Sequence, residues 1–522
     1  KDDEFGTPFY RAYRAALKVV LKRRVISGVA TLALFFGTLP LWTVVPQNFF
    51  PPMGRAFFMA EFSLPYGTSI ETTRKMCERI DEFIETELVV KDGQEGVHTW
   101  TTFIGETPPT FTLGYTPSPS LSGFSEFMLN TTSVDVIPEL MAKLQDFAKA
   151  EFPSAKTYIR ELSNGPPSDR PIEIDISGPD VGQTFEIVKK VKAKLTSMGG
   201  VVEIDDNWGK RAKKMEVDID EARALRVGLS NSDIATAVQT FVSGLETTKF
   251  REDEDQIPVV LRASATGRRD FDTVRNLAVF SRSSSVPLGQ VADAEVKWEY
   301  PAIRRKDRSR TVSVQASTIG DVTAMGVVAE IRPWLEAEKE AWGFGYDFEF
   351  GGDFESSNEA NGAIGGKLPI AGLAIVMLLV LQFNSMRKPA IVLSAIILGL
   401  IGVVVGLVVM NSVFGFMALL GVVSLAGIVV NNAIVLLDRI QLEIDEGRAP
   451  YDAIINAAQQ RVRPILLTTA TTVASLVPLY LSGGAMWEPL AVVIMFGLVI
   501  STFMTLLVVP LLYSLLYRVK TV

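Results

Sequence analysis

Six long apolar runs constrain the fold of this chain more than any other feature of its sequence. They predict membrane-spanning helices, because about 20 residues of α-helix cross the hydrocarbon core of a bilayer. Buried helices of a soluble core are the alternative, which the length of the uncharged runs disfavours. The runs lie at about 25–45, 368–383, 390–410, 416–437, 464–481 and 489–517.

Basic residues near the ends of these runs indicate their orientation. Lys and Arg precede the first run, and they recur between the second and third, between the fourth and fifth, and after the sixth. The two loops on the other side, at 411–415 and 482–488, contain neither residue. Because basic loops favour the cytoplasm, we expect both ends of the chain there and the region between the first two runs outside.

The region between the first two runs, about 50–365, has the pattern of a water-soluble α+β protein. Strands and amphipathic helices follow one another as β-α-β twice before Pro171, the pattern of a split-βαβ, ferredoxin-like unit. The pattern restarts at 172–207 and finishes at 311–351. The sequence therefore predicts an internal repeat whose second copy carries a large insert, with a helix near 231–242 and an exposed hairpin at 246–256.

Composition excludes several classes of function. The chain has one cysteine and one histidine, so it cannot form an intrachain disulfide or a histidine-based metal site alone. Its formal net charge of −8 argues against nucleic acid as a partner. The sequence contains no phosphate-binding loop and no Cys/His pair. We therefore expect no enzyme and no cofactor.

Uncharged polar residues mark the fourth and fifth runs. Asn431 and Asn432 lie in the fourth. On the fifth, one face carries Thr468, Thr471, Thr472 and Ser475. Hydrogen bonding between helices is one interpretation, and the lining of a proton path is the other. Amides and hydroxyls do not titrate near neutral pH, so the carboxylates of a proton path would have to come from elsewhere.

Two segments carry a resemblance to a known family. Gly427–Asp438 and Arg461–Thr468 resemble segments of TM10 and TM11 in the resistance–nodulation–division (RND) efflux transporters. The order of elements is similar over essentially the whole chain. The resemblance is to the C-terminal half of AcrB-like transporters, in the hydrophobe/amphiphile branch. It implies a bundle of six transmembrane helices, TM7–TM12, plus an α+β periplasmic domain with two ferredoxin-like porter subdomains.

The resemblance also implies a division of the chain. The membrane parts would be a cytoplasmic N-terminal segment (1–24), a TM7-like helix (25–45) and TM8–TM12-like helices (365–522). The remaining parts would be a PC1-like porter subdomain (50–165), a PC2-like porter subdomain in two pieces (166–209 and 307–360) and a docking subdomain-like insert (210–306).

The resemblance implies a proton relay at four polar residues. Thr468 matches the family's threonine and Arg461 its cytoplasmic arginine, whereas Asn431, followed by Asn432, falls where the family has a lysine. Asparagine has no charge that could respond to a carboxylate, so the relay would be neutralised differently here. The family's aspartate pair lies in its N-terminal half, which would be a required partner on the same or a separate chain.

The resemblance places a substrate pocket in the first repeat. The candidate substrate-binding residues are Phe103, Phe111, Tyr115, Phe124 and Phe127. Aromatic rings on an adaptable loop suit varied apolar ligands. Phe127, on a predicted strand, also fits an ordinary position in the core.

These features predict a proton-driven exporter of hydrophobic or amphiphilic organic compounds. The implied setting is a trimer in the inner membrane of a Gram-negative bacterium, with a periplasmic adaptor protein and an outer-membrane channel. Metal export is an alternative that needs soft ligands, but Met59, Met76 and Met128 do not cluster in the sequence. A non-transporting scaffold is another. The substrate, and whether the trimer is homomeric, stay open.

Overall fold

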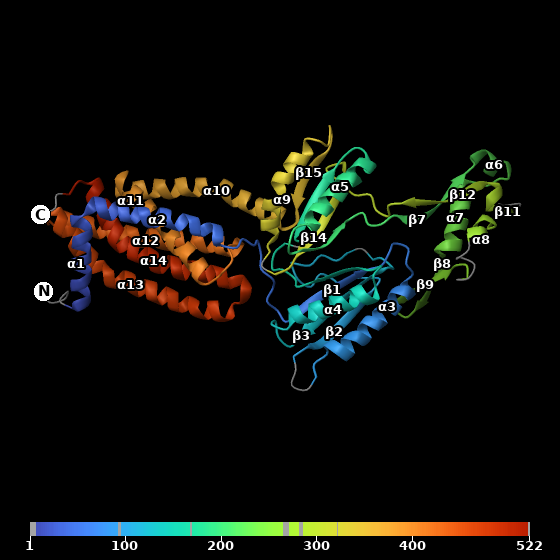
Figure 1. Cartoon of the computed structure of the whole chain (residues 1–522), viewed down its shortest axis with the longest axis horizontal. Helices are drawn as coiled ribbons and strands as arrows, with labels where there is room; N and C mark the ends of the chain where they lie inside the picture. The colour runs from blue at the N-terminus through green and yellow to red at the C-terminus, as the bar shows by residue number, and fades with distance from the viewer. Residues whose placement is uncertain are drawn as a thin grey trace. The chain divides into compact units, whose positions relative to one another are not determined.

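The computed structural model places most of the chain in two compact units. It describes residues 7–91, 95–118, 120–166, 170–264, 271–280, 285–320 and 322–519. One unit is the inserted subdomain, Trp208–Ile303, and the other comprises the residues on both sides of it. Figure 1 labels the elements that are described below.

Six helices in the described part of the chain are long and apolar enough to cross a membrane, as predicted. They are α2 (Arg24–Thr38, continued by a 3-10 turn to Val44), α10 (Gly352–Phe383), α11 (Arg387–Val409), α12 (Phe416–Asp445), α13 (Pro450–Ser482) and α14 (Gly484–Leu516). α11, α12 and α13 all pack against α14 (Figure 1). α10 and α13 begin well before their apolar runs, because a helix continues through polar turns that hydropathy does not register.

A short amphipathic helix, α1 (Pro8–Lys22), precedes the first of these six helices. It packs against α13 and α14 through the buried side chains of Leu17 and Leu21. The backbone leaves the helical conformation at Arg23, where φ is −108° and ψ is 52°, and α2 begins at the next residue. α1 and α2 are therefore separate helices with a bend between them.

The first α/β subdomain has six regular elements. They are β1 (Phe57–Ser63), α3 (Ile70–Phe83), β2 (Val97–Ile104), β3 (Phe124–Thr131), α4 (Ile137–Glu151) and β4 (Lys156–Arg160). The strands form an antiparallel sheet in the order β2-β3-β1-β4. α3 and α4 bury one face of this sheet, so the other face, called the open face below, is free to carry different chemistry.

The second α/β subdomain repeats this arrangement around the insert. Its elements are β5 (Ile172–Ser177), α5 (Val181–Thr196), β6 (Val201–Asp206), β13 (Arg305–Lys306), β14 (Ser309–Thr318), α9 (Ala324–Lys339) and β15 (Asp347–Gly351). β14 pairs with β5 and β6, and β15 pairs with the other edge of β5. The order β6-β14-β5-β15 matches that of the first sheet, position by position.

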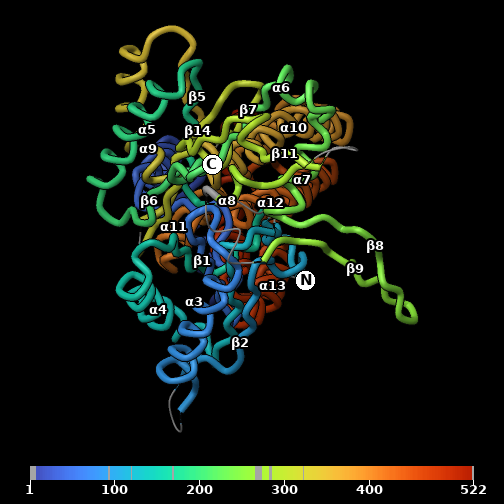
Figure 2. The backbone as a smooth tube through the Cα atoms, turned by 90° about the vertical axis from the view of Figure 1, so that its right-hand side faces the viewer, coloured from blue at the N-terminus to red at the C-terminus, as the bar shows by residue number. Residues whose placement is uncertain are grey.

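The inserted subdomain contains short strands and helices of its own. They are β7 (Ala212–Ile219), α6 (Glu221–Arg226), α7 (Asn231–Val242), β8 (Leu245–Glu252), β9 (Asp255–Leu261), α8 (Phe271–Arg275), β10 (Ala278–Phe280), β11 (Ser285–Pro287) and β12 (Ala292–Glu299). A reciprocal capping box between Ser230 and Asp233 starts α7. Figure 2 shows β8 and β9 as a long ribbon, and nearly all of its side chains are exposed.

Candidate functional site

The two faces of the first sheet differ in chemistry because side chains alternate along each strand. On β1, Phe58 and Phe62 lie in the core under α3 and α4. Met59 and Glu61 occupy the alternate positions, on the open face. Met59 is nevertheless fully buried, because the loops that follow β2 and β4 cover it through Tyr115 and Leu162.

Two methionines meet on the open face. Met59 on β1 lies directly opposite Met128 on β3 in the antiparallel ladder, and Met53 packs into the same cluster. Met76 on α3 instead lies in the core on the covered face. The expectation that the methionines do not cluster is therefore wrong: residues far apart in sequence become cross-strand neighbours once the register is set.

A pocket opens beside these methionines. Its volume is about 380 Å³. Met53, Met128, Phe57 and Phe111 supply its apolar wall. Its other lining residues are Arg55, Ala56, Thr112 and Asn130. The pocket thus offers thioether sulfur and aromatic surface together with a few polar groups, as binding sites usually do.

A buried carboxylate lies next to the methionines on β3. Glu126 is 1% exposed, and its Oε2 accepts a hydrogen bond of 2.6 Å from the Tyr115 hydroxyl. Its Oε1 is buried and has no hydrogen-bond partner within the described chain. Burial, reinforced by the negative charge of Glu61, raises the pKa of Glu126 to about 7 although the Tyr115 bond opposes the shift. Glu126 can therefore gain or lose a proton near neutral pH.

The neighbouring carboxylate is already paired. Glu61 lies opposite Glu126 in the ladder, and its Oε1 accepts a hydrogen bond of 2.9 Å from Arg160 on β4. Both side chains of this ion pair are less than a fifth exposed. Glu61 is thus neutralised by Arg160, whereas Glu126 has no ion-pair partner among the described residues.

Four of the five predicted aromatic residues lie near this site. Phe103 on β2 is directly opposite Glu126, and Phe124 lies two positions before Glu126 on the same strand face. The ring of Phe111 is 5.1 Å from that of Tyr115, centroid to centroid. The structure thus brings Phe103, Phe111, Tyr115 and Phe124 to the open face.

Phe127 lies on the covered face instead. Its side chain is fully buried and packs edge-to-face against Phe62, with ring centroids 5.5 Å apart. Both rings belong to the core under α3 and α4. Strand alternation separates Phe127 from Glu126 and Met128, so Phe127 cannot contact a ligand in the pocket without unfolding the sheet.

The predicted relay residues lie on α12 and α13, which pack against each other. Asn432 is 8% exposed, whereas Asn431 and Thr468 are exposed. The Thr468 hydroxyl donates to the carbonyl of Ile465 in its own helix, at 2.9 Å. Among the described residues, no hydrogen bond joins Thr468 to either asparagine. Arg461 is half-buried, and its Nε has no hydrogen-bond partner in that part of the chain.

Small and polar residues lie among apolar ones on the uncovered sides of these two helices. On α12 they are Ser424, Gly427 and Asn431, spaced one turn apart, and on α13 they include Thr468, Thr471 and Ser475. In the hydrocarbon region, polar side chains and small residues are typical of helix–helix contacts and poorly suited to lipid.

Known proteins are similar to this chain over different lengths. The cobalt-zinc-cadmium resistance protein CzcA of Cupriavidus metallidurans is 29% identical over 368 residues, which cover 69% of this chain and 34% of that protein. The cation efflux system protein CzcA of an Alcaligenes species matches equally well. The chain thus spans about a third of the length of these curated relatives.

Solved structures share the fold. Two crystal forms of a heavy metal efflux pump superpose with TM-scores of 0.77 and 0.76 at 22% and 21% identity. Each match covers 97% of this chain but only 51% and 52% of the other chain.

These relatives correct the predicted function. The prediction of hydrophobic or amphiphilic organic substrates, and of the hydrophobe/amphiphile branch, is wrong: the relatives carry names of metal resistance and cation efflux. Aromatic residues suggested an organic pocket because the sequence displays them in one loop, whereas the methionines that adjoin them meet only in the folded sheet.

The family itself is shown by a match along nearly the whole chain. The model of the AcrB/AcrD/AcrF family matches residues 5–517, and six apolar helices with an α+β domain form the same architecture as the solved pumps. These features describe a multi-pass membrane protein. The chain belongs to the AcrB/AcrD/AcrF family of RND efflux transporters.

Proposed function

We propose that this chain is part of a transporter that exports transition-metal cations. The observation that carries the proposal is the cluster of Met53, Met59 and Met128 beside the unpaired Oε1 of Glu126. The names of its CzcA relatives support the same class of substrate.

The proposed ligands favour soft cations. Thioether sulfur binds soft metal ions better than hard ones, and Glu126 would add one negative charge after losing its proton. Of the ions in the relative's name, cadmium is the softest and fits thioethers best. Because Glu126 has a pKa of about 7, metal binding would release a proton and would strengthen as the pH rises through neutrality.

We propose porter roles for the two α/β subdomains. The strand orders β2-β3-β1-β4 and β6-β14-β5-β15, each with two helices on one face, support a ferredoxin-like topology for both. This proposal keeps the predicted division of the chain. The PC1-like subdomain is 50–165, the PC2-like subdomain is 166–209 with 307–360, and the docking-like insert is 210–306. In this proposal the aromatic residues Phe103, Phe111, Tyr115 and Phe124 shield the metal site from water.

In this proposal, proton movement across the membrane drives transport. The uncovered polar sides of α12 and α13 suit contact with helices that bear carboxylates, which ionise within a membrane only at high cost unless they are paired. Thr468, Asn431, Asn432 and Arg461 would then form this chain's part of the relay. The carboxylates would lie in a second set of helices outside the sequence described here.

The proposed assembly follows the family. Three such pumps would form a trimer in the inner membrane of a Gram-negative bacterium, with the α/β subdomains in the periplasm. A periplasmic adaptor protein and an outer-membrane channel would complete the export path.

Substituting leucine for methionine tests the metal site. Leucine fills a similar volume without the sulfur, so Met59→Leu with Met128→Leu should lower cadmium tolerance of cells expressing the complete pump by about tenfold, the effect of ~1.4 kcal/mol lost at the site. Met76→Leu, in the core on the other side of the same sheet, is the matched control and should leave tolerance unchanged.

Membrane levels of each variant must match the wild type for this comparison to count. Equal tolerance in the double variant and the wild type would refute the thioether site. Thr468→Ala tests the relay separately: we expect loss of transport with normal metal binding, and recovery with Thr468→Ser. Full transport by Thr468→Ala would remove Thr468 from the relay.

A further inference from the structure

The amphipathic helix α1 has a charged face that the transport mechanism above does not use. From residue 7 to residue 24 the sequence contains no Asp or Glu. Its basic residues are Arg11, Arg14, Lys18, Lys22, Arg23 and Arg24. A helix of this composition beside a membrane is a candidate for contact with lipid.

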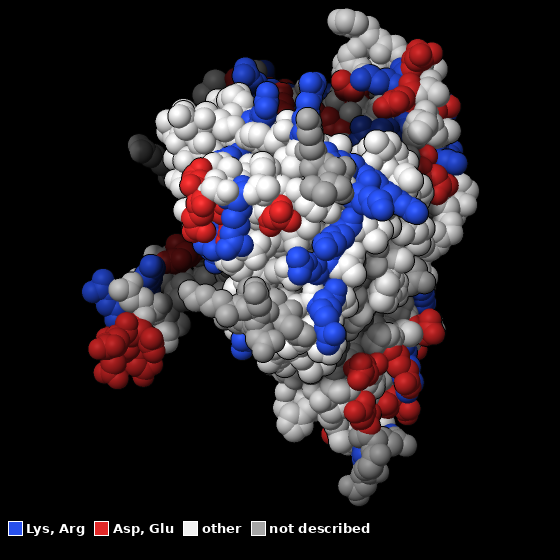
Figure 3. Space-filling model, turned by 90° about the vertical axis from the view of Figure 1, so that its left-hand side faces the viewer, with Lys and Arg blue, Asp and Glu red and all other residues white. Residues whose placement is uncertain are grey.

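Four of these cations form one stripe. With 3.6 residues per turn, Arg11, Arg14, Lys18 and Lys22 fall within about 80° of the helix circumference. All four are exposed, and within the described chain none has an ion-pair partner. Figure 3 shows Lys and Arg side chains in a row on the face at the end of the molecule where α1 lies. Among residues 7–519 as the structure describes them, the stripe therefore presents positive charge that no acidic side chain pairs.

A second face of α1 holds the helix against the bundle. Leu17 and Leu21 are fully buried, and the Tyr13 hydroxyl donates to the carbonyl of Leu506 on α14, at 2.8 Å. At the bend, Arg24 donates to the carbonyls of Leu21 and Ser514. These contacts fix the rotation of α1, so the direction of the cationic stripe is set by the fold.

A third face is apolar and uncovered. Phe9 and Val19 are 52% and 59% exposed. Beyond the bend, α2 exposes Val25, Ile26 and Val29, each by 60% or more. The uncovered apolar surface of α1 thus continues into that of a membrane-spanning helix, which places α1 at the boundary between acyl chains and headgroups.

We propose that the cationic stripe of α1 binds the phosphate groups of anionic phospholipids. The complementary charge, the fixed direction of the stripe and its continuity with the lipid-facing surface of α2 together select a lipid headgroup as the occupant. Clusters of Lys and Arg at the cytoplasmic ends of membrane helices attract anionic lipids in this way. The site is independent of the transported ion.

Lipid retention by the purified full chain tests the proposal. In mixtures of phosphatidylglycerol and phosphatidylethanolamine with identical acyl chains, native mass spectrometry should show preferential retention of phosphatidylglycerol by the wild type. Arg14→Gln with Lys18→Gln should weaken that retention about 25-fold, at roughly fivefold for each basic side chain near the surface.

Three controls make the result decisive. Lys149→Gln with Lys189→Gln removes two exposed charges from helices α4 and α5 and should change nothing. Arg14→Lys with Lys18→Arg keeps the charge and should keep the lipid. Equal retention by the Gln variant and the wild type would overturn the proposal, and so would displacement of the lipid by millimolar inorganic phosphate, which would indicate a simple anion site.

Discussion

The two α/β subdomains have the same strand order but opposite chemistry on their open faces. In the first, β1 and β3 present Met59, Met128 and a carboxylate, Glu126, with one oxygen unbonded. In the second, the equivalent strands β5 and β14 present acidic, amide and hydroxyl side chains that bond groups of the same subdomain. The first sheet therefore leaves the groups of the proposed ligand site on its open face, whereas the second bonds most of its polar side chains within the subdomain.

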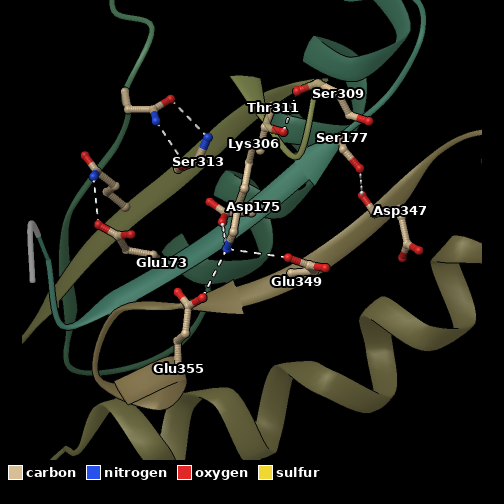
Figure 4. A network of polar contacts seen from close by, with 12 residues as sticks. Glu173, Asp175, Ser177, Lys306, Ser309, Thr311, Ser313, Asp347, Glu349 and Glu355 are labelled. Carbon is tan, nitrogen blue, oxygen red and sulfur yellow. Dashed lines mark hydrogen bonds and ion pairs between the residues drawn. The ribbon is translucent and has the colours of Figure 1, made fainter. Parts of the chain in front are cut away.

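A single lysine organises the open face of the second subdomain. Lys306, from the strand that follows the insert, contacts Asp175 on β5 at 2.9 Å, Glu355 on α10 at 3.3 Å and Glu349 on β15 at 3.5 Å (Figure 4). Burial alone would lower the pKa of Lys306, but the bond and charge of Asp175 raise it above its usual value. The lysine thus joins β13 to the sheet and to the first turn of α10.

A further side-chain hydrogen bond lies on the same face. The Gln315 side chain on β14 donates to Glu173 on β5 at 2.9 Å. Polar groups that satisfy one another rigidify a surface and leave little for a ligand. Asp175 also has a buried oxygen, Oδ1, without a hydrogen-bond partner among the described residues, but its Oδ2 pairs with the cation of Lys306. Glu126 is instead hydrogen-bonded to the neutral Tyr115 hydroxyl. The two sheets therefore differ in whether a lysine neutralises the buried carboxylate.

The largest expected effect tests the difference between the covered face and the open face of the first sheet. Phe127→Ala should cost about 3–5 kcal/mol of local stability, because it empties a fully buried position under α3 and α4. Phe111→Ala, on the open face and 44% exposed, should cost less than about 1 kcal/mol. Hydrogen exchange of β3 amides in the intact protein measures both. Similar costs for the two variants would contradict the division into covered and open faces.

Loss of the organising lysine should have the next largest effect. Lys306→Met leaves the buried Asp175 without its cation. Removing one partner of a buried pair costs 3–5 kcal/mol, and the partial exposure of Lys306 reduces our expectation to about 2 kcal/mol. Faster hydrogen exchange in β5, β15 and the first turns of α10 would report it.

An exposed pair in the same subdomain is the control for that variant. Lys339 contacts Asp347, and both side chains are over 40% exposed. Lys339→Met should change stability by less than about 0.5 kcal/mol. If the two lysine variants behaved alike, the Lys306 cluster would be an ordinary surface pair and the contrast between the subdomains would weaken.

The periodicity of the sequence predicts much of this fold, whereas the candidate site depends on the register of the paired strands. Helix α7 at Asn231–Val242 lies where the sequence predicts a helix, because periodicity and capping are local properties. The proximity of Met59 and Met128 is not local: it depends on the antiparallel register of two strands that are separated by helix α3, strand β2 and a long loop. A shift of either strand by one residue would place the two methionines on opposite faces of the sheet. The sequence alone does not specify the register.

The sequence did not predict Glu126 as a site residue for a similar reason. Glu126 stands in a strand where an acidic residue ordinarily indicates a solvent-facing position. Alternation does place it on the face away from the helices, but Tyr115 and the loop that carries it then cover that face. An acidic residue flanked by Phe124 and Met128 at alternate positions was the available signal, because an otherwise apolar strand face predicts burial.

The smallest expected effect concerns the proton on Glu126. Burial raises its folded pKa to about 7, above the unfolded value near 4.5. The carboxyl is therefore neutral in both states below about pH 4.5, and its burial destabilises the fold progressively as the pH rises through 7. Glu126→Gln removes this dependence, so the variant should gain stability relative to the wild type between pH 5 and pH 8, by about 1 kcal/mol once relaxation is allowed for.

The second subdomain supplies the matched control for this titration. Glu173→Gln replaces a carboxylate that accepts a bond from Gln315, so it should lose about 1 kcal/mol at all these pH values. Hydrogen exchange of β3 and β5 at pH 5 and pH 8, corrected for intrinsic rates, separates the two. If the Glu126→Gln variant had the same stability as the wild type at both pH values, Glu126 would stay ionised in the folded protein. Proton release on metal binding would then have no source on this sheet, and the open face of the first subdomain would resemble that of the second.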